Sequence, residues 1–462
     1  MKTAVINSKV FMADGYRIDP DIHMSEGVAI RRVLNSLPYP LSTVGDNSER
    51  VFLGNIFSRV FVKDAEHGMP YLAASDSVLS NIETGRYLSN KQCAQLSNLI
   101  LQKNWILVTC SGTLGNVTYT NELYENHIAT HDLIRIIPNS SKVNKGTLYA
   151  FLVSKYGYYQ ITQSMFGGVV KHINDNQTKE IIVPVFPSEI QSIIDNNISR
   201  SAQLKETAHN SLKEALDLVE DFISESYKKE FYKSARVSVK DVISSLQYRL
   251  DPPAIMNDGV IHMRDVCSRM EHSTIGRINA KVYRPGIFKR NYVEDGIPYI
   301  KGSEIFLASP FLRCQKLSRT RTPFIDEMSL KAGQILITCA GSVGDIKLIT
   351  KEYEDKRAIG SQDIIRLESY DDLYSKEYLF IYLQQPFVHD YIQSMKYGSV
   401  IERIEPFHVE SIPVVKPTEE LNDKIKELVS NYMECTYKAF VLEEKSVSLI
   451  EDSIEHPDKY NC

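Results

Sequence analysis

The chain has 462 residues, a length that predicts two to four domains. Hydrophobic residues make up 43% of it and charged residues 24%, a balance that is typical of globular proteins and excludes a largely disordered chain. The formal net charge of -5 argues against a protein whose whole surface coats nucleic acid, but it is compatible with local basic patches.

The sequence lacks the signals of a membrane or secreted protein. It contains no run of about 18 apolar residues, so no membrane span is predicted, and its first residues form no apolar signal core. Its seven cysteines are scattered, and none is spaced for a zinc site. We therefore expect free thiols in a reducing cytoplasm and no bound metal.

The chain repeats itself at an offset of about 230 residues. Six segments of the first half return in the same order in the second half, which chance does not explain. The paired segments are 16–20 with 248–252, 68–72 with 296–300, 109–115 with 338–344, 132–135 with 363–366, 163–165 with 393–395, and Pro187 with Pro417. The sequence therefore predicts a duplicated domain, and this is its strongest signal.

Within each copy the predicted elements follow the same order. A short buried strand ends at a tight glycine turn, and then come a second strand, an amphipathic helix and a last strand before a proline. These elements are 105–109, 133–137, 148–164 and 181–183 in the first copy, and 334–338, 364–367, 378–395 and 412–415 in the second. Each copy is therefore predicted to be a mixed α+β domain.

A long helix is predicted after each copy. Residues 188 to about 232 contain no Gly or Pro, and their apolar residues alternate at spacings of four and three, as they do after residue 417. A helix of about 40 residues is about 60 Å long, and with one apolar stripe it needs a partner. We expect the two helices to pair as an antiparallel coiled coil. The alternative is that each stripe packs on its own domain.

These patterns divide the chain into four predicted segments. Residues 1–187 form the first domain, 188–235 the first spacer helix, 236–417 the second domain and 418–462 the second spacer helix. Two similar domains held apart by a rigid spacer would contact two DNA half-sites at a fixed separation.

The duplicated plan resembles the specificity (S) subunits of type I restriction-modification systems, which carry two target recognition domains, each followed by a long helix. The resemblance covers nearly the whole chain. Its motifs are the Arg-x-Asp segments at 17–19 and 249–251, the glycine-turn strands at 106–115 and 335–344, and the helix-loop-strand units at 163–187 and 393–417. The family's PxPxxEQ run is reduced at 184–191 and 413–420, which is compatible with a divergent phage-defence branch.

The resemblance implies a non-catalytic subunit. Each target recognition domain would read one half of a bipartite site in double-stranded DNA, and the helices would set the unread gap. Adenine-N6 methyltransferase subunits would dock on the helices, and a restriction-translocase subunit would join them. S-adenosylmethionine, ATP and Mg are then expected on these partners. The helix residues predicted to serve in partner binding are Ala208, Leu212, Val219, Leu428, Tyr432 and Leu442.

No catalytic motif in the sequence competes with this interpretation. Residues 251–254, Asp-Pro-Pro-Ala, approach the (Asp/Asn)-Pro-Pro-aromatic loop of amino-methyltransferases but lack its ring. No Gly-x-x-x-x-Gly-Lys-(Ser/Thr) loop for ATP is present. Ser111 has no evident His/Asp partner set, and His131 is more simply a structural residue.

Polar loops of the two copies supply the candidate DNA-reading residues, because Arg and Lys bind phosphates while Arg, Lys, Asn, Gln, Ser and Thr read base edges. The candidates in the first copy are Arg59, Lys63, Ser111, Thr113, Lys171, His172 and Asn174. Those in the second copy are Lys289, Arg290, Lys301, Ser303, Ser342 and Arg403. Taken singly, each is as readily a solvated surface residue. As a set they recur in both copies with different identities, which suits two different half-sites.

Two other functions stay open. A protein-interaction scaffold that kept the duplicated fold fits the acidic net charge, and a basic face on both domains would count against it. An unrecognised enzyme would need a cleft that contains buried carboxyl groups or histidines with strongly shifted pKa values.

Overall fold

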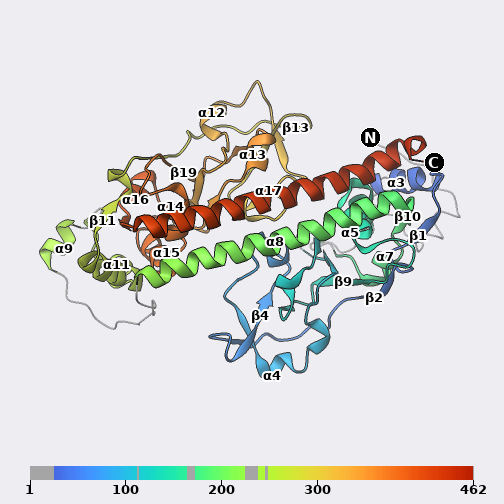
Figure 1. Ribbon diagram of the computed structural model, residues 1–462, viewed down its shortest axis with the longest axis horizontal. Helices are drawn as coiled ribbons and strands as arrows, with labels where there is room; N and C mark the ends of the chain where they lie inside the picture. Colours follow the sequence, from blue (N-terminus) through green and yellow to red (C-terminus); the bar gives the residue numbers. More distant parts are fainter. Residues whose placement is uncertain (1–24, 112–113, 164–171, 224–237, 245–247, 461–462) are drawn as a thin grey trace. The chain divides into compact units, whose positions relative to one another are not determined.

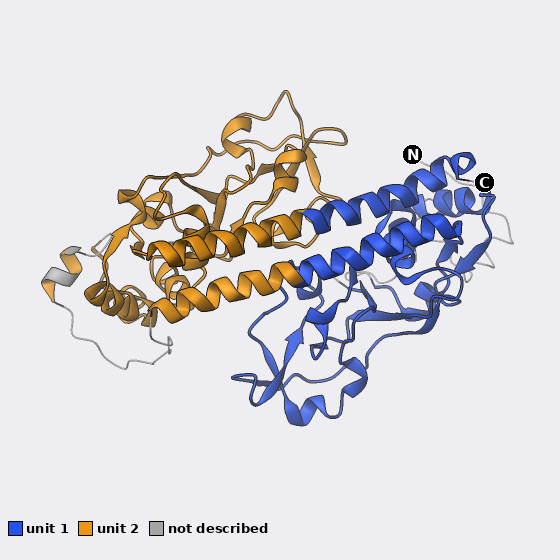
Figure 2. Cartoon of the chain, in the orientation of Figure 1, with its two compact units in different colours: residues 1–206, 438–462 blue, residues 207–437 orange. Residues whose placement is uncertain are grey.

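The computed structural model describes residues 25–111, 114–163, 172–223, 238–244 and 248–460. Figure 1 shows their helices and strands. The chain divides into two compact units, one made of residues 1–206 and 438–462 and the other of residues 207–437 (Figure 2). Both units mix helices with strands, which confirms the predicted α+β class.

The described strands of the first unit form three small sheets. One four-stranded sheet has the order β2-β9-β6-β7, a second has the order β3-β5-β4-β8, and β1 pairs with β10. The strands are β1 (Leu41–Thr43), β2 (Ser48–Phe52), β3 (Phe61–Val62), β4 (Gly68–Leu72), β5 (Tyr87–Ser89), β6 (Ile106–Thr109), β7 (Val117–Tyr119), β8 (Ile128–Ala129), β9 (Leu133–Pro138) and β10 (Ile182–Pro184). The helices are α3 (Glu26–Asn35), α4 (Asn90–Cys93), α5 (Lys145–Val153), α6 (Lys155–Gln163), α7 (Asp175–Lys179) and α8 (Ser188–Ile223), the last of which continues into the second unit.

The second unit repeats this topology strand for strand. Its sheets have the orders β12-β19-β16-β17, β13-β15-β14-β18 and β11-β20. The strands are β11 (His272–Thr274), β12 (Ala280–Tyr283), β13 (Tyr292–Val293), β14 (Ile297–Ile300), β15 (Gln315–Leu317), β16 (Ile335–Thr338), β17 (Ile346–Leu348), β18 (Ile359–Gly360), β19 (Ile364–Ser369) and β20 (Pro413–Val415). The helices are α9 (Val239–Ser244), α10 (Pro252–Ile255), α11 (Asp258–Arg269), α12 (Ile325–Met328), α13 (Lys351–Asp355), α14 (Lys376–Leu383), α15 (Pro386–Ser394), α16 (Pro406–Glu410) and α17 (Glu419–Glu455), whose C-terminal part belongs to the first unit.

The strands before the glycine turns occupy the centre of each copy. All four residues of β6 and all four of β16 are buried, as their unbroken apolar runs predict. In each copy this strand pairs with the same neighbour in the same register, Ile106 with Ile136 and Ile335 with Leu367. The prediction of these strands is therefore confirmed in both copies.

The turn after each central strand is closed by a backbone hydrogen bond. The Gly115 N–H donates to the Thr109 carbonyl (3.1 Å), and the Gly344 N–H donates to the Thr338 carbonyl (2.8 Å). Both glycines have positive φ angles, 78° and 88°, which side-chain-bearing residues rarely adopt. The glycines are therefore required by the turn itself, as the sequence predicts.

The prediction of one helix at 148–164 and one at 378–395 is wrong in one respect, because each segment contains two helices. In the second copy Pro386 begins α15, and a proline fits a first helical position but not a helix interior. In the first copy the chain turns at Ser154, whose ψ of 162° ends α5. A Cβ atom on Gly157 would lie 2.3 Å from the Phe151 carbonyl oxygen, so this glycine allows α6 to return closely against α5.

An amide side chain at the start of each long helix fastens that helix to its own domain. Gln191 of α8 donates to the Lys142 carbonyl (3.1 Å), and Asn422 of α17 donates to the Asp372 carbonyl (2.8 Å). Both amides are buried, and the Asn144 N–H also donates to the Gln191 side chain (2.8 Å). Each domain is therefore attached to its helix by the same buried contact.

Within each unit a segment of α8 contacts a segment of α17. In the first unit the Ser201 hydroxyl donates to the Ala439 carbonyl (3.2 Å), and Lys205 forms an ion pair with Glu443 (2.6 Å). In the second unit the Asn431 amide donates to the Ser211 hydroxyl (2.8 Å).

Among the described helices, none is long and apolar enough to cross a membrane.

Candidate nucleic-acid interface

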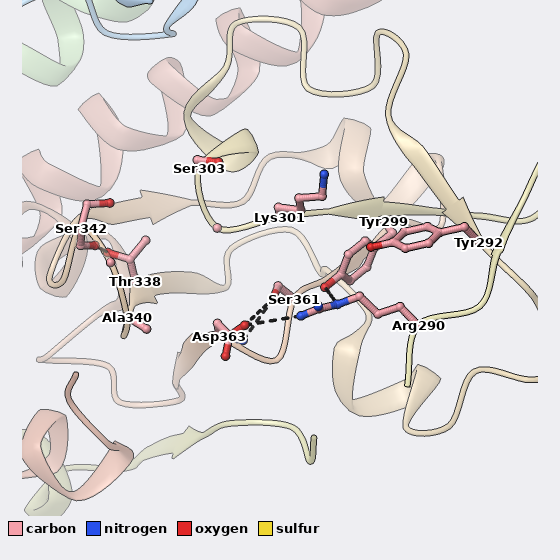
Figure 3. Close-up of a pocket in the computed structure, with 12 residues that line it drawn as sticks. Arg290, Tyr292, Tyr299, Lys301, Ser303, Thr338, Ala340, Ser342, Ser361 and Asp363 are labelled. Atoms are coloured by element: carbon pink, nitrogen blue, oxygen red, sulfur yellow. Dashed lines mark hydrogen bonds and ion pairs between the residues drawn. The ribbon is translucent and has the colours of Figure 1, made fainter. Parts of the chain in front are cut away.

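A cavity of about 320 Å³ in the second copy brings together four of the six candidates that the sequence offers there (Figure 3). The candidates are Arg290, Lys301, Ser303 and Ser342. The remaining lining residues are Tyr292, Tyr299, Gly302, Thr338, Ala340, Gly341, Ser361 and Asp363. We call this site the polar cavity. It is lined by the glycine turn after β16 and by the segments that follow β14 and β18.

Arg290 is fixed on one wall of the polar cavity. Its Nε–H donates to the Tyr299 hydroxyl (2.9 Å), and one of its terminal nitrogens lies 3.5 Å from a carboxylate oxygen of Asp363. Tyr299 is itself buried, so the arginine is held by a group that cannot move freely. Figure 3 shows the guanidinium group directed at Asp363 with the tyrosine ring beside it.

The carboxylate that faces Arg290 is also held in place. The Gln362 amide donates to Asp363 Oδ2 (3.2 Å), and the Asp363 N–H donates to the Ser361 hydroxyl (3.2 Å). Burial lowers the pKa of Arg290, while its hydrogen bond to Tyr299 and the nearby Asp363 charge raise it, and the net result is a raised pKa. The arginine therefore stays a cation at this site.

The first copy builds the same arrangement around Arg59. The Arg59 Nε–H donates to the Tyr71 hydroxyl (2.6 Å), and Tyr71 is buried like Tyr299. A terminal nitrogen of Arg59 donates to the Thr130 hydroxyl (3.1 Å), a group that directly follows β8 as Ser361 follows β18. The Arg–Tyr pair is thus a feature of both copies.

The two copies differ in the acid that accompanies this pair. In the second copy Asp363 faces Arg290, whereas in the first copy the corresponding Asp132 lies beside His131, with 3.5 Å between the imidazole Nε2 and a carboxylate oxygen. The common scaffold therefore presents a different charge pattern in each copy.

Sequence reasoning selected the two arginines but missed their tyrosines. Tyr71 and Tyr299 belong to a Gly-x-Pro-Tyr segment that both copies contain, and the sequence alone marks this segment only as part of the duplication. A tyrosine in an apolar strand suggests a core position. The arginine that binds its hydroxyl lies in a loop, and the spacing of residues in the sequence does not show where that loop lies. The recurrence of both residue types in the two copies is the signal that could have identified the pair.

The two remaining candidates of the second copy, Lys289 and Arg403, are not among the residues that line the polar cavity. Arg403 forms an antiparallel bridge with Ala340, a lining residue, so its loop adjoins the glycine turn. Lys289 is exposed next to Arg290 but does not line the cavity. The Lys301 ammonium group lies 3.4 Å from the Glu304 carboxylate, so its positive charge is partly offset there.

The candidates of the first copy are more dispersed. Thr113 and Lys171 lie outside the described residues, and Lys63 is exposed between β3 and β4. Ser111 is half-buried and lies two residues after the end of the central strand. Their use in DNA binding stays a prediction.

His172 and Arg403 occupy matching loops, as the sequence indicates. The residue that follows each of them donates its backbone N–H to the same position, Ile173 to the Cys110 carbonyl (3.3 Å) and Ile404 to the Cys339 carbonyl (3.0 Å). Each loop is therefore joined to the end of the central strand of its copy.

Asn174 has a local structural role in addition to its candidate role in DNA binding. Its side chain accepts the Gln177 N–H (2.8 Å) and so caps α7. Glu405 caps α16 at the matching position of the second copy, with His408 as its reciprocal partner. The residue types differ, but both are suited to a helix cap.

Two buried groups outside the lining of the polar cavity have raised pKa values. Burial raises the pKa of the Glu352 carboxyl group, but Glu352 does not line the cavity. Burial also raises the pKa of the Cys110 thiol to about 11, so that the thiol stays protonated at neutral pH. The lining of the polar cavity supplies hydrogen-bonding groups and charged side chains.

The sequence matches the model of one protein family twice. The family is described as the type I restriction modification DNA specificity domain, and the matches cover residues 51–215 and 277–439. The chain belongs to this family. Each specificity domain of the chain thus includes its Arg–Tyr pair and the first part of the long helix that follows.

Three solved structures are among those to which the chain is similar. The S subunit of a type I restriction-modification system from M. genitalium is 14% identical, with a TM-score of 0.38 and coverage of 90% of this chain and 96% of that chain. The HsdS subunit from Thermoanaerobacter tengcongensis is 13% identical, with a TM-score of 0.28 and coverage of 91% and 98%. A third structure, described by complex assembly and conformational transition of the type I R-M system, is 13% identical, with a TM-score of 0.27 and the same coverage. No curated protein matches the sequence significantly.

Six helix residues are predicted to serve in partner binding, and the structure describes their surroundings. Ala208, Val219, Leu428 and Tyr432 are buried, and Leu212 and Leu442 are half-buried. Tyr432 stacks on Phe380 with 6.0 Å between ring centroids. Four of the six side chains are thus packed within the chain and two are partly exposed, and their use in partner binding stays a prediction.

Proposed function

We propose that this chain is the non-catalytic subunit that gives a restriction-modification complex its DNA sequence specificity, and that each specificity domain reads one half of a bipartite site. The observation that carries the proposal is the pair of equivalent cationic sites, Arg59 with Tyr71 and Arg290 with Tyr299, on two domains of the DNA specificity family. A fixed arginine with polar neighbours suits contact with a base edge or a phosphate.

Different neighbours around these arginines support two different half-sites. Thr130 accompanies Arg59, whereas Asp363 accompanies Arg290. An acid beside the arginine changes which bases are accepted, because a carboxylate accepts hydrogen bonds and repels acceptors. The shared scaffold fixes the position of the contacts, and the variable groups select the bases.

We further propose that α8 and α17 pair as an antiparallel coiled coil that sets the gap between the half-sites. The contacts between Ser201 and Ala439 and between Ser211 and Asn431 support this arrangement, because the residue number rises along α8 as it falls along α17. With 36 and 37 residues, each helix is about 54 Å long at 1.5 Å per residue. A spacer of this length fixes the number of unread base pairs.

Adenine-N6 methyltransferase subunits and a restriction-translocase subunit are the proposed protein partners, in the cytoplasm. S-adenosylmethionine, ATP and Mg would be bound by those partners. Charged exposed residues on the helices, such as Lys213, Glu214 and Asp217 of α8, are available for docking because the apolar stripe faces inward. The negative net charge of the chain fits contact with a partner protein on surfaces away from DNA.

The proposal is tested by co-purification with the adjacent-encoded methyltransferase, followed by methylation mapping of host DNA. We expect a split motif with adenine methylation. Exchange of the first domain together with the start of α8 should change only one half of the motif, and the matched exchange of the second domain should change only the other half. A motif that changes in both halves, or no methylated motif, would contradict the proposal.

The alternative is a protein-interaction scaffold that does not read DNA, and the net charge of -5 favours it. DNA retention by the purified chain at low salt separates the two, because phosphate contacts weaken steeply as salt rises. If the partner proteins bind but DNA does not, the scaffold function is correct.

A further inference from the structure

We propose that Arg290 reads a guanine base in the half-site of the second specificity domain. This inference rests on the proposed function and adds to it the residue and the base. Two observations carry it: which N–H groups of Arg290 are bound within the protein, and which charged group lies beside them.

The free N–H groups of Arg290 form a fork. A guanidinium group has five N–H donors, and the Nε–H of Arg290 is bound to the Tyr299 hydroxyl at 2.9 Å. The NH2 nitrogen lies 3.5 Å from the Asp363 carboxylate. In the described part of the chain, neither NH1 hydrogen has a protein acceptor. NH1 and NH2 can therefore present two parallel donors to a ligand at the end of the side chain.

Two acceptors side by side match this fork. In the major groove guanine presents O6 and N7, and the bidentate contact of Arg with these atoms is the commonest specific contact in protein–DNA complexes. Phosphate also offers paired oxygens to arginine, so the fork alone does not distinguish a base from the backbone.

Asp363 distinguishes the two ligands. A phosphate bound to the end of Arg290 would lie close to the Asp363 carboxylate, and the two negative charges would repel each other. A base edge carries no net charge, and next to a guanine the carboxylate can accept from the amino group of a neighbouring cytosine. The ion pair therefore favours a base over a phosphate at Arg290.

The support of the arginine also favours a specific contact. Tyr299 is 1% exposed, Gln362 donates to Asp363, and together they hold the guanidinium group in one place. Ordering a free arginine costs side-chain entropy at the moment of binding, and a preformed arrangement avoids most of that cost. Arg59 is held in the same way by Tyr71 and Thr130.

The test is selection of bound duplexes from a randomised DNA library by the full-length chain and its variants. We expect Arg290→Ala to lose a guanine preference at one position of one half-site and to weaken binding of the preferred duplex by about ten- to hundredfold, with little change for duplexes that have another base there. Arg59→Ala, which alters the first domain, should leave this guanine preference unchanged.

Two matched variants separate the base contact from a charge effect. Lys289→Ala removes a cation from the adjacent exposed position and should weaken all duplexes by a similar factor. Arg290→Lys keeps the charge but not the planar fork, so it should keep general affinity for DNA and lose most of the guanine preference. If Arg290→Ala does not fold, Arg290→Lys alone still tests the base contact.

The outcomes are distinguishable. If Arg290→Ala weakens all duplexes equally and Arg290→Lys restores them, the arginine contacts a phosphate and this inference is wrong, while the proposed function stands. If both variants keep the guanine preference, Arg290 is not the reader. If the wild-type chain selects no sequence, the proposed function itself fails.

Discussion

Arg135 and Arg366 are fully buried at equivalent positions of the two copies and donate to equivalent backbone carbonyls. The guanidinium group of Arg135 donates to the carbonyl groups of Leu133 (2.8 Å) and Ala129 (2.9 Å). That of Arg366 donates to those of Ile364 (2.8 Å) and Gly360 (3.0 Å). Each arginine thus connects β9 or β19 to the end of the short parallel strand that precedes it, and burial lowers the pKa of both side chains to about 10.

We predict that Arg366→Met destabilises the second unit by about 3 kcal/mol or more, because several buried carbonyl groups lose their donor. The measurement is chemical denaturation, with hydrogen exchange of β18 and β19 as a local readout. Arg290→Ala is the control, because its partly exposed side chain should cost much less. An equal loss of stability in the two variants would contradict this explanation.

The glycine turn that lines the polar cavity gives a second prediction. Gly344 has a φ of 88°, and a Cβ atom there would lie 2.9 Å from Ile392. Gly344→Ala should therefore cost about 1 to 3 kcal/mol and displace the turn, with a loss of sequence preference in DNA selection. Gly302→Ala is the control, since Gly302 lines the cavity and a Cβ atom added there has no other atom within 4 Å. The same loss of preference in both variants would show that the turn geometry is not the cause.

The ionisation of buried Glu352 should make the stability of the second unit depend on pH. Burial raises the pKa of its carboxyl group above the unfolded value, so the folded state binds the proton more tightly. Its contribution to stability is then full below the unfolded pKa and is lost as pH rises through the folded pKa. Glu352→Gln, which keeps an acceptor for the Thr350 hydroxyl, should make the unit more stable than wild type at neutral pH.

This difference should shrink as the pH is lowered towards the ordinary carboxyl range, because the wild-type group becomes protonated. Denaturation curves of both proteins across the pH range provide the measurement. A variant that is less stable at neutral pH, or a difference that does not depend on pH, would mean that the carboxylate forms a favourable contact instead.

Helix length provides a prediction for the spacer. Seven residues that continue the apolar spacing, inserted after Glu206 in α8 and after Tyr437 in α17, add about 10.5 Å. At 3.4 Å per base pair, the gap in the methylated motif should grow by about 3 base pairs, with both half-sites unchanged. Insertion into α8 alone is the control, and it should destabilise the protein because the stripes no longer match. An unchanged gap in the double insertion would refute the spacer role.

Much of the fold follows from the repeat and from apolar runs. The buried strands β6 and β16 and the glycines that end their turns could be predicted, because these features depend on a few adjacent residues. The break between α14 and α15 was missed although Pro386 stands there, because the apolar pattern continues across it. Local pattern thus predicts the elements better than their ends.

The candidate site was predicted only in part. Arg290, Lys301, Ser303 and Ser342 were selected as polar loop residues, and the structure brings them to one cavity. The partner of Arg290 was not predictable, because the Tyr299 hydroxyl is reached only after β14 is placed in its sheet. Contacts of this kind depend on the tertiary fold and leave no periodic pattern in the sequence.

The buried amides at Gln191 and Asn422 restrict how such proteins can exchange parts in evolution. Each amide lies on the long helix but serves the domain before it, by donating to Lys142 or Asp372. A recombination event that joins a foreign domain at the first helical residue would separate the two halves of this contact. Crossovers farther along α8 or α17 would transfer each domain with its own amide, so new combinations of specificity domains could arise without loss of this contact.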